Sequence, residues 1–230
     1  MADDARTDAN VITEAADDGR LPLVDVRVVL FTVADGELLV ALQSDGSRWH
    51  LPRGLPFAGI SLDAAARTII HEATHLHEQY LEQLYTLSLR EAPRWSVIVC
   101  YIALLPSEAA GAPNMTASWR PIREATLNDA DRMVFDYALM RLRAKLGYTT
   151  IAFHLLPATF TLSELQSAYE AVLGRPLDKR NFRRRMIAAG ILEGMEEKRR
   201  DGSHRPAQLY RFRAGHDPAA FLTPSWAGDV

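Results

Sequence analysis

The sequence predicts an α+β protein with two domains, and three observations lead to this prediction. Runs of apolar residues that suit β-strands lie before residue 106, with one helical segment among them. Two short helices and a basic hairpin are predicted after residue 150. Residues 145–213 carry 13 Lys and Arg against 7 Asp and Glu, although the 230-residue chain has a net charge of −3. This local basic excess indicates that the C-terminal domain meets nucleic acid and the N-terminal domain does not.

The N-terminal domain is predicted to be built around a sheet. Residues 1–20 hold six Asp and Glu against two Arg, which predicts a disordered acidic tail before it. Two apolar runs flank Asp35-Gly36, a turn dipeptide that predicts a β-hairpin. The expected elements are strands at 26–33, 38–42, 80–89 and 95–105 and a helix at 62–76. This domain is expected to span residues 21–125.

A long helix is expected to join the two domains. Apolar residues recur at helical spacing over residues 129–146, as in an amphipathic helix. We therefore place the domain boundary between Pro121 and Asp129. The units expected after residue 125 are a linking helix at 126–147, a second domain at 148–215 and a tail at 216–230.

The second domain contains two short helices separated by a turn. The first follows a capping box formed by Thr161 and Glu164, and it is expected to stop at Gly174 with Pro176 just beyond. The second helix, over 178–190, carries five cations near its start. Two short helices joined by a glycine-containing turn, the second one basic, are typical of a helix-turn-helix DNA-binding domain.

The basic helix is predicted to enter the major groove of DNA. At about 100° per residue, Phe182, Met186 and Ala189 share one face, so most of the cations lie away from it. Arginine matches guanine edges, asparagine pairs with adenine, and other cations neutralise phosphates. The alternatives are a solvated basic face without a partner and a module that contacts RNA or a protein. The expected DNA contacts in the two helices are Thr161, Ser163, Lys179, Arg180, Asn181, Arg183, Arg184 and Arg185.

A basic hairpin is predicted downstream of the two helices. Short strands at 191–193 and 209–212 flank a polar tip at 196–206. Two helices followed by a basic-tipped hairpin give the order of a winged helix-turn-helix. The tip is expected to follow the phosphate backbone or to reach into the minor groove. The expected contacts there are Arg200, His204 and Arg205.

Cysteine usage and hydropathy predict a cytoplasmic protein. Cys100 is the single cysteine, which excludes an internal disulfide and favours a reducing compartment. It lies in an apolar run, where a core position is expected. The sequence has no apolar stretch of about 18 residues and no signal-like start, so neither a membrane partner nor export is expected.

One short string matches a metalloprotease pattern. Residues 71–75 read H-E-x-x-H, in which two histidines bind zinc and the glutamate activates water. The apolar stripe of the predicted helix lies on the other side, so His71 and His75 are expected toward solvent, and no extended ligand pattern follows. We therefore predict neither a zinc protease nor a functional metal site, and adventitious surface binding of metal is the favoured alternative.

The N-terminal domain resembles a Nudix domain. The resemblance rests on W-x-L-P-x-G at 49–54, a following alanine-rich helix and the strand at 80–86. With the winged helix behind it, the chain over residues 21–212 resembles the Nudix-related transcriptional regulators of NAD metabolism. That resemblance implies an α/β/α sandwich, a homodimer formed through these domains and a palindromic operator in double-stranded DNA near genes of NAD synthesis or salvage. It also implies release by ADP-ribose or a related nucleotide, with no other cofactor.

The sequence departs from the Nudix hydrolase box, which places acidic side chains on one helix face to hold a divalent metal against a diphosphate. With Gly54 as the start of the box, Glu72 is the single metal-binding carboxylate left. The charged positions are otherwise occupied by Ile60, Thr68, Ile69 and Ala73. We therefore expect a transcriptional repressor whose degenerate Nudix-like domain senses a nucleotide without hydrolysing it. The alternative is a hydrolase of ADP-ribose-type nucleoside diphosphates that uses carboxylates outside the box.

A pocket that has lost its metal cluster still suits a nucleotide sensor. Arg53 beside Gly54 is a candidate contact for a diphosphate, and an aromatic ring is a candidate for stacking on the base. Each candidate has a structural alternative: the rings suit the core, the arginines suit ion pairs, and the glutamate suits an exposed helix face. The candidate effector-binding residues are Arg27, Trp49, Arg53, Gly54, Glu72 and Tyr101.

Overall fold

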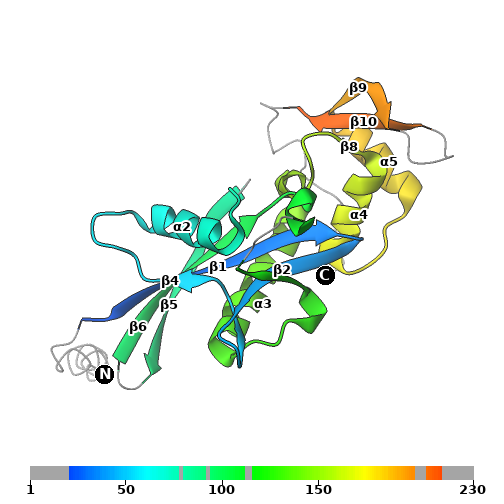
Figure 1. Cartoon of the computed structure of the whole chain (residues 1–230). Coiled ribbons are helices and arrows are strands. Elements are labelled where there is room, and N and C mark those ends of the chain that lie inside the picture. Colours follow the sequence, from blue (N-terminus) through cyan, green and yellow to red (C-terminus); the bar gives the residue numbers. More distant parts are fainter. Residues whose placement is uncertain (1–20, 78–79, 92–93, 112–115, 200–205, 214–230) are drawn as a thin grey trace, which may run out of the picture.

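A mixed sheet between two helices forms the larger part of the protein (Figure 1), which we describe from a computed structural model. The structure describes residues 21–77, 80–91, 94–111, 116–199 and 206–213. The sheet follows the order β3-β2-β1-β6-β5, with β4 also paired to β1 and β7 to β2. Its strands are β1 (Leu23–Ala34), β2 (Glu37–Ser44), β3 (Trp49–His50), β4 (Arg53–Gly54), β5 (Tyr80–Glu91), β6 (Arg94–Leu104) and β7 (Ser118–Pro121).

Strand pairing explains the hairpin that the sequence predicts. Asp35 and Gly36 join β1 to β2 with φ values of 51° and 76°, which suit the tight turn of a twisted hairpin. At the centre of the sheet, β1 runs parallel to β6, and Arg27 pairs with Cys100 in that register. The predicted turn and the four long strands are therefore confirmed, each within a few residues of its expected ends.

Helix α2 (Leu62–Thr74) covers one face of the sheet. Ser61 caps its first turn by accepting a hydrogen bond from the Ala64 amide at 3.1 Å. Its alanines and isoleucines pack against the apolar residues of β1 and β6 that point to this side. The helix ends at Thr74, two residues before the predicted end, because His75 adopts a left-handed conformation with φ 57°.

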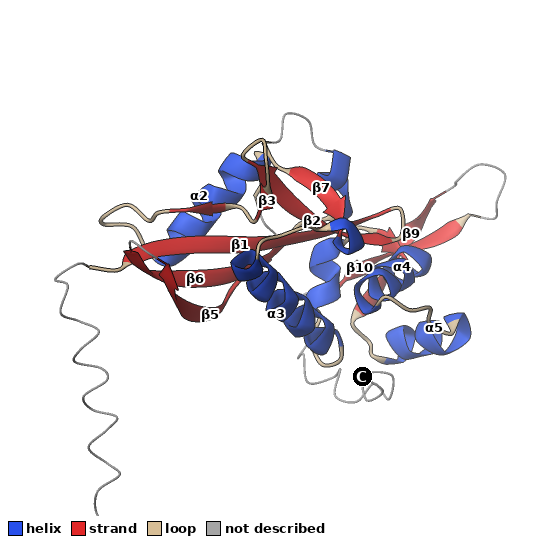
Figure 2. Ribbon diagram, turned by 90° about the horizontal axis from the view of Figure 1, so that it is seen from below, coloured by secondary structure: helices blue, strands red, loops and turns tan. Residues whose placement is uncertain are grey.

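Helix α3 (Asp129–Leu146) covers the opposite face of the sheet (Figures 1 and 2). Its bounds are those that the sequence predicts, because Asn128 caps the first turn through the Asp131 amide at 2.9 Å. Phe135 stacks against Phe31 of β1, with ring centroids 6.0 Å apart. The helix expected to link the domains is therefore also one layer of the sandwich.

The C-terminal domain has the expected order of two helices and a hairpin. Its three-stranded sheet follows the order β8-β10-β9. Its elements are α4 (Leu162–Leu173), α5 (Lys179–Ala188), β8 (Phe160–Thr161), β9 (Leu192–Arg199) and β10 (Ala207–Phe212). The chain also forms short 3-10 helices, which are η1 (Ser107–Gly111), η2 (Ile122–Glu124) and η3 (Ile151–Leu155). The polar tip was expected from residue 196, but β9 continues to Arg199 because Lys198 and Arg199 pair with Gln208 and Ala207.

A single apolar cluster extends from the sandwich into the C-terminal domain. It joins Val29 and Phe31 of β1 to Leu165 of α4 and Phe182 of α5, through the residues of α3 and η3. Movement of α4 and α5 against the sheet is therefore resisted by shared packing. None of the helices in the described part of the chain is long and apolar enough to span a membrane. The tails predicted at 1–20 and 216–230 lie outside the residues that the structure describes.

Candidate DNA interface and nucleotide site

Helix α5 presents a cationic surface because its apolar side is docked on α4. Phe182 and Met186 are buried, and the Phe182 ring meets the Tyr169 ring edge-on at 5.3 Å. Asp178 caps the helix by accepting from the Asn181 amide at 2.8 Å. The exposed polar residues of the helix are Lys179, Arg180, Asn181 and Arg184, of which Arg180 and Arg184 lie opposite the docked side.

Two of the expected DNA contacts from α4 differ in their surroundings. Ser163 is exposed and its Oγ accepts a hydrogen bond from Arg183 Nη2 at 3.0 Å. Thr161 is buried, and its Oγ1 accepts from the Glu164 amide at 3.2 Å as part of the predicted capping box. The side chain of Thr161 is therefore committed to starting the helix, whereas Ser163 and Arg183 lie together at the surface.

The wing is tied to α4 by a cation that was not among the expected DNA contacts. Arg199 Nη1 of β9 donates to Glu164 Oε1 at 2.5 Å, and its Nη2 donates to the Thr159 carbonyl at 3.4 Å. Glu164 Oε2 also accepts from the Thr161 amide at 2.7 Å. One carboxylate thus serves the helix cap and the wing at once. Arg200, His204 and Arg205, expected at the tip of the wing, lie outside the described residues.

The helix face that would carry catalytic carboxylates in a hydrolase is apolar here. Ile69 and Ala73 of α2 are buried in the core beneath the helix. Gly54 lies so close that a Cβ built on it would be 3.3 Å from Ile69 Cγ1. Glu72, on the same helix, is exposed. The segment around Gly54 therefore meets an apolar side chain of α2.

Two of the six candidate effector-binding residues, Arg27 and Tyr101, lie on opposite faces of the sheet. Arg27 points toward α3, where its Nη1 donates to Asp131 Oδ1 at 2.8 Å. Tyr101 points toward α2, where its hydroxyl donates to Asp63 Oδ1 at 2.6 Å. Neighbouring residues of a strand point to opposite faces, and Arg27 pairs with Cys100, the residue before Tyr101. The structure therefore does not bring all six candidates into one pocket.

Arg27 and Tyr101 both have the surroundings of structural residues. Arg27 is buried between Asp131 and Asp25, at 2.8 and 2.9 Å. Although burial opposes its charge, these two carboxylates raise the pKa of Arg27. Tyr101 is also buried, and burial followed by its bond to Asp63 raises the pKa of the phenol.

Trp49 and Arg53 lie on the short strands β3 and β4. Arg120 of β7 stacks over the partly buried ring of Trp49, with its Cζ 4.4 Å from the ring centroid. Arg53 of β4 pairs with Arg27 in register but is exposed, and it has no ion pair among the described residues. Arg53 is thus the candidate cation that is open to a diphosphate.

The histidines of the H-E-x-x-H string are exposed, as the helical pattern predicts. The rings of His71 and His75 lie edge-on at 6.0 Å, and His71 stacks on His77 at 5.2 Å. The residues that the structure describes contain no group of three or more His, Cys, Asp or Glu placed to hold a metal ion.

Comparison with known proteins identifies the C-terminal domain and a related repressor. Residues 152–212 match the NrtR DNA-binding winged helix domain. The chain is 36% identical over 211 residues to the ADPR responsive transcriptional repressor NtrR of Acinetobacter baylyi. The matched residues cover 83% of this chain and 82% of that protein.

Two crystal structures of Shewanella oneidensis NrtR extend the likeness to the fold. The structure complexed with a 27mer DNA is 30% identical, covers 86% of this chain and 95% of its own, and has a TM-score of 0.74. A second structure of Shewanella oneidensis NrtR is 32% identical, covers 87% of this chain and 96% of its own, and has a TM-score of 0.73. The protein therefore belongs to the NrtR family of transcriptional repressors, in which a Nudix-like domain precedes a winged helix DNA-binding domain.

Proposed function

We propose that this protein represses transcription by binding double-stranded DNA through α5 and the wing, and that ADP-ribose or a related nucleotide releases it. The observation that carries the proposal is the exposure of Lys179, Arg180, Asn181 and Arg184 on a helix docked through Phe182 and Met186. A docked helix with outward cations suits the major groove. As the family resemblance implies, the regulated genes are those of NAD synthesis or salvage.

Sequence-specific binding by such a domain is strongest when two copies act together. We propose a homodimer that places two α5 helices about one DNA turn apart, or a multiple of it, on a palindromic operator. The crystallised relative from Shewanella oneidensis is bound to a 27mer DNA, a length that accommodates two half-sites one turn apart. A palindrome is the expected operator because its symmetry mirrors that of the dimer.

The nucleotide is proposed to act through the arrangement of the domains. Arg53 is the candidate contact for its diphosphate, because Arg53 is exposed and has no ion pair among the described residues. Helix α3 contacts both the sheet and α4, so it is the element that transmits a change. The nucleotide lowers DNA affinity only to the extent that it prefers the arrangement that binds DNA less well.

A gel shift at fixed salt tests this function directly. Promoter fragments of NAD-synthesis genes from the source genome are expected to be retarded specifically, and ADP-ribose is expected to relieve the retardation. Unrelated DNA of equal length is the control, since non-specific binding depends on charge alone. Equal retardation of both fragments, or preference for RNA in competition, would overturn the proposal.

We further propose that the protein does not hydrolyse the nucleotide it senses. Ile69 and Ala73 bury the helix face on which a hydrolase would hold its metal, and the related protein of Acinetobacter baylyi is named a repressor. Incubation of ADP-ribose with the full chain and Mg²⁺ or Mn²⁺ is expected to release no AMP above the rate without protein. Release of AMP above that rate, retained in Glu72→Gln, would instead establish the hydrolase alternative that uses carboxylates outside the box.

A further inference from the structure

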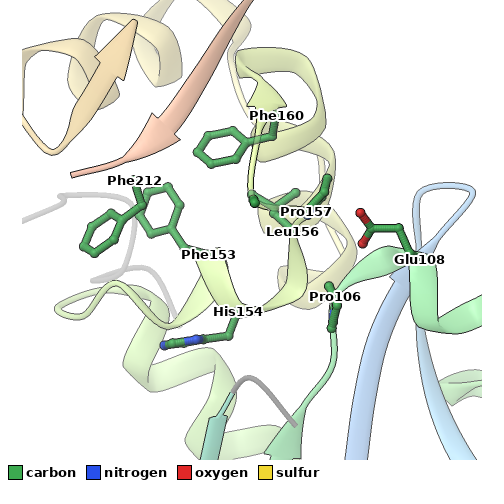
Figure 3. Close-up of a pocket in the computed structure, with 9 residues that line it drawn as sticks. Pro106, Glu108, Phe153, His154, Leu156, Pro157, Phe160 and Phe212 are labelled. Carbon is green, nitrogen blue, oxygen red and sulfur yellow. The ribbon is translucent and has the colours of Figure 1, made fainter. Parts of the chain in front are cut away.

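A pocket of about 480 Å³ lies where the two domains meet (Figure 3). Pro106 and Glu108 contribute from the end of the sandwich, and the C-terminal domain contributes the remaining wall. Ligand sites in proteins have volumes of about 300–1,000 Å³ and occur preferentially at domain junctions. None of the candidate DNA contacts or effector-binding residues lines this pocket.

Three phenylalanines from different elements form the aromatic wall of the pocket. Phe153 of η3 lies 5.5 Å from Phe160 of β8 and 4.8 Å from Phe212 of β10, measured between ring centroids. Phe160 is almost completely buried, whereas Phe153 and Phe212 are partly open. Tilted rings at these distances hold one another in place and leave aromatic surface for a flat ligand to contact.

The charged side chain of the pocket is Glu108. Figure 3 shows its carboxylate directed toward the side of the pocket that Leu156 and Pro157 form. It is exposed, and it forms no ion pair with any residue that the structure describes. The other titratable group of the lining, His154, is partly buried, and burial lowers its pKa. At neutral pH its imidazole is therefore uncharged, and it does not offset the negative charge of Glu108.

We propose that this pocket binds a planar aromatic cation, with its ring against the phenylalanines and its charge toward Glu108. Aromatic faces attract cations because their π-systems are electron-rich. The negative carboxylate of Glu108 also attracts a cation. An anionic nucleotide meets repulsion here. The pocket is therefore a separate site from the one proposed for ADP-ribose, and this inference does not rest on that proposal.

Three probes with the same ring and different charges test the pocket on the full chain: benzamidinium, benzamide and benzoate. Binding is measured by titration calorimetry or ligand-observed NMR. Benzamidinium is expected to bind with millimolar affinity, as suits a ligand of so few atoms, benzamide more weakly, and benzoate not detectably. Equal binding of all three, or no binding of benzamidinium at concentrations on the order of tens of millimolar, would overturn the proposal.

Variants locate the binding and separate charge from shape. Glu108→Gln is expected to weaken benzamidinium about threefold, in line with an exposed charge pair, and to leave benzamide unchanged. Phe153→Leu is expected to weaken both probes, because it removes the ring and keeps the apolar volume. Glu197→Gln, an exposed glutamate on β9, is the matched control and is expected to change neither affinity.

The same variants would contradict the proposal if they left the affinities for benzamidinium and benzamide unchanged. An unchanged preference for the cation in Glu108→Gln would place benzamidinium elsewhere. Thermal unfolding checks that each variant is folded. If Phe153→Leu lowers the melting temperature, Phe212→Leu at the end of β10 supplies the same test of the aromatic wall.

Discussion

Replacing Arg180 and Arg184 together by alanine is expected to lower the affinity for operator DNA on the order of 100-fold. Both side chains are exposed on the side of α5 away from Phe182 and Met186. A specific arginine contact to a base contributes about 1–3 kcal/mol, so two of them account for this loss. Each lost phosphate contact would also make the salt dependence of binding shallower by about one unit. Titration by fluorescence anisotropy at several salt concentrations measures both effects.

The fold of the double variant is expected to survive. Alanine favours the helix at least as well as arginine, and removing two like charges at i and i+4 relieves repulsion. Arg132→Ala is the control, because Arg132 is also exposed but lies on α3, where it pairs with Asp136 at the surface. If the double variant binds the operator with unchanged affinity and salt dependence, α5 is not the recognition helix.

The helices of this protein could be predicted from sequence because their ends are fixed locally. Asn128 caps α3, and Thr161 with Glu164 caps α4, and each signal lies within four residues of the end it sets. The short strand β7 was not predicted. Its four residues are held by pairing with β2, more than seventy residues earlier, and no local pattern announces such pairing.

The candidate nucleotide site was harder to predict because it depends on strand register. Arg27 and Tyr101 were expected in one pocket, yet the parallel pairing of β1 with β6 sends them to opposite faces. A shift of one residue in that register would have put them on the same face. The sequence of each strand specifies its own alternation but contains no local signal for the register of the pair.

The role of a surface cation likewise depends on distant partners. Arg199 belongs to the same basic run as the residues expected at the wing tip, but Glu164, thirty-five positions away, binds its guanidinium. Charge patterning identified the basic domain correctly. It could not separate a cation that holds the wing in place from cations that are free to meet phosphates, because that distinction requires the folded positions of both groups.

Replacing Asp131 by alanine is expected to lower the free energy of unfolding by about 3 kcal/mol, the lower end of the cost of breaking a buried ion pair. Asp131 has no exposed surface, and its carboxylate accepts from Arg27 at 2.8 Å and from the Leu51 amide at 3.3 Å. The variant removes the acceptor of these two buried donors and of Asn128 Nδ2, and it leaves Arg27 with Asp25 as its remaining ion-pair partner. Denaturant unfolding measures the change.

Asp136→Ala is the matched control for this prediction. Asp136 lies on the same helix, but it is exposed and pairs with Arg132 across one turn at 3.0 Å, an interaction of about 0.3–0.5 kcal/mol. A small and equal effect of both variants would show that the Arg27 pair is not a structural support. A large effect of Asp131→Ala alone would assign Arg27 to joining β1 and α3, and would leave Arg53 as the candidate for the diphosphate.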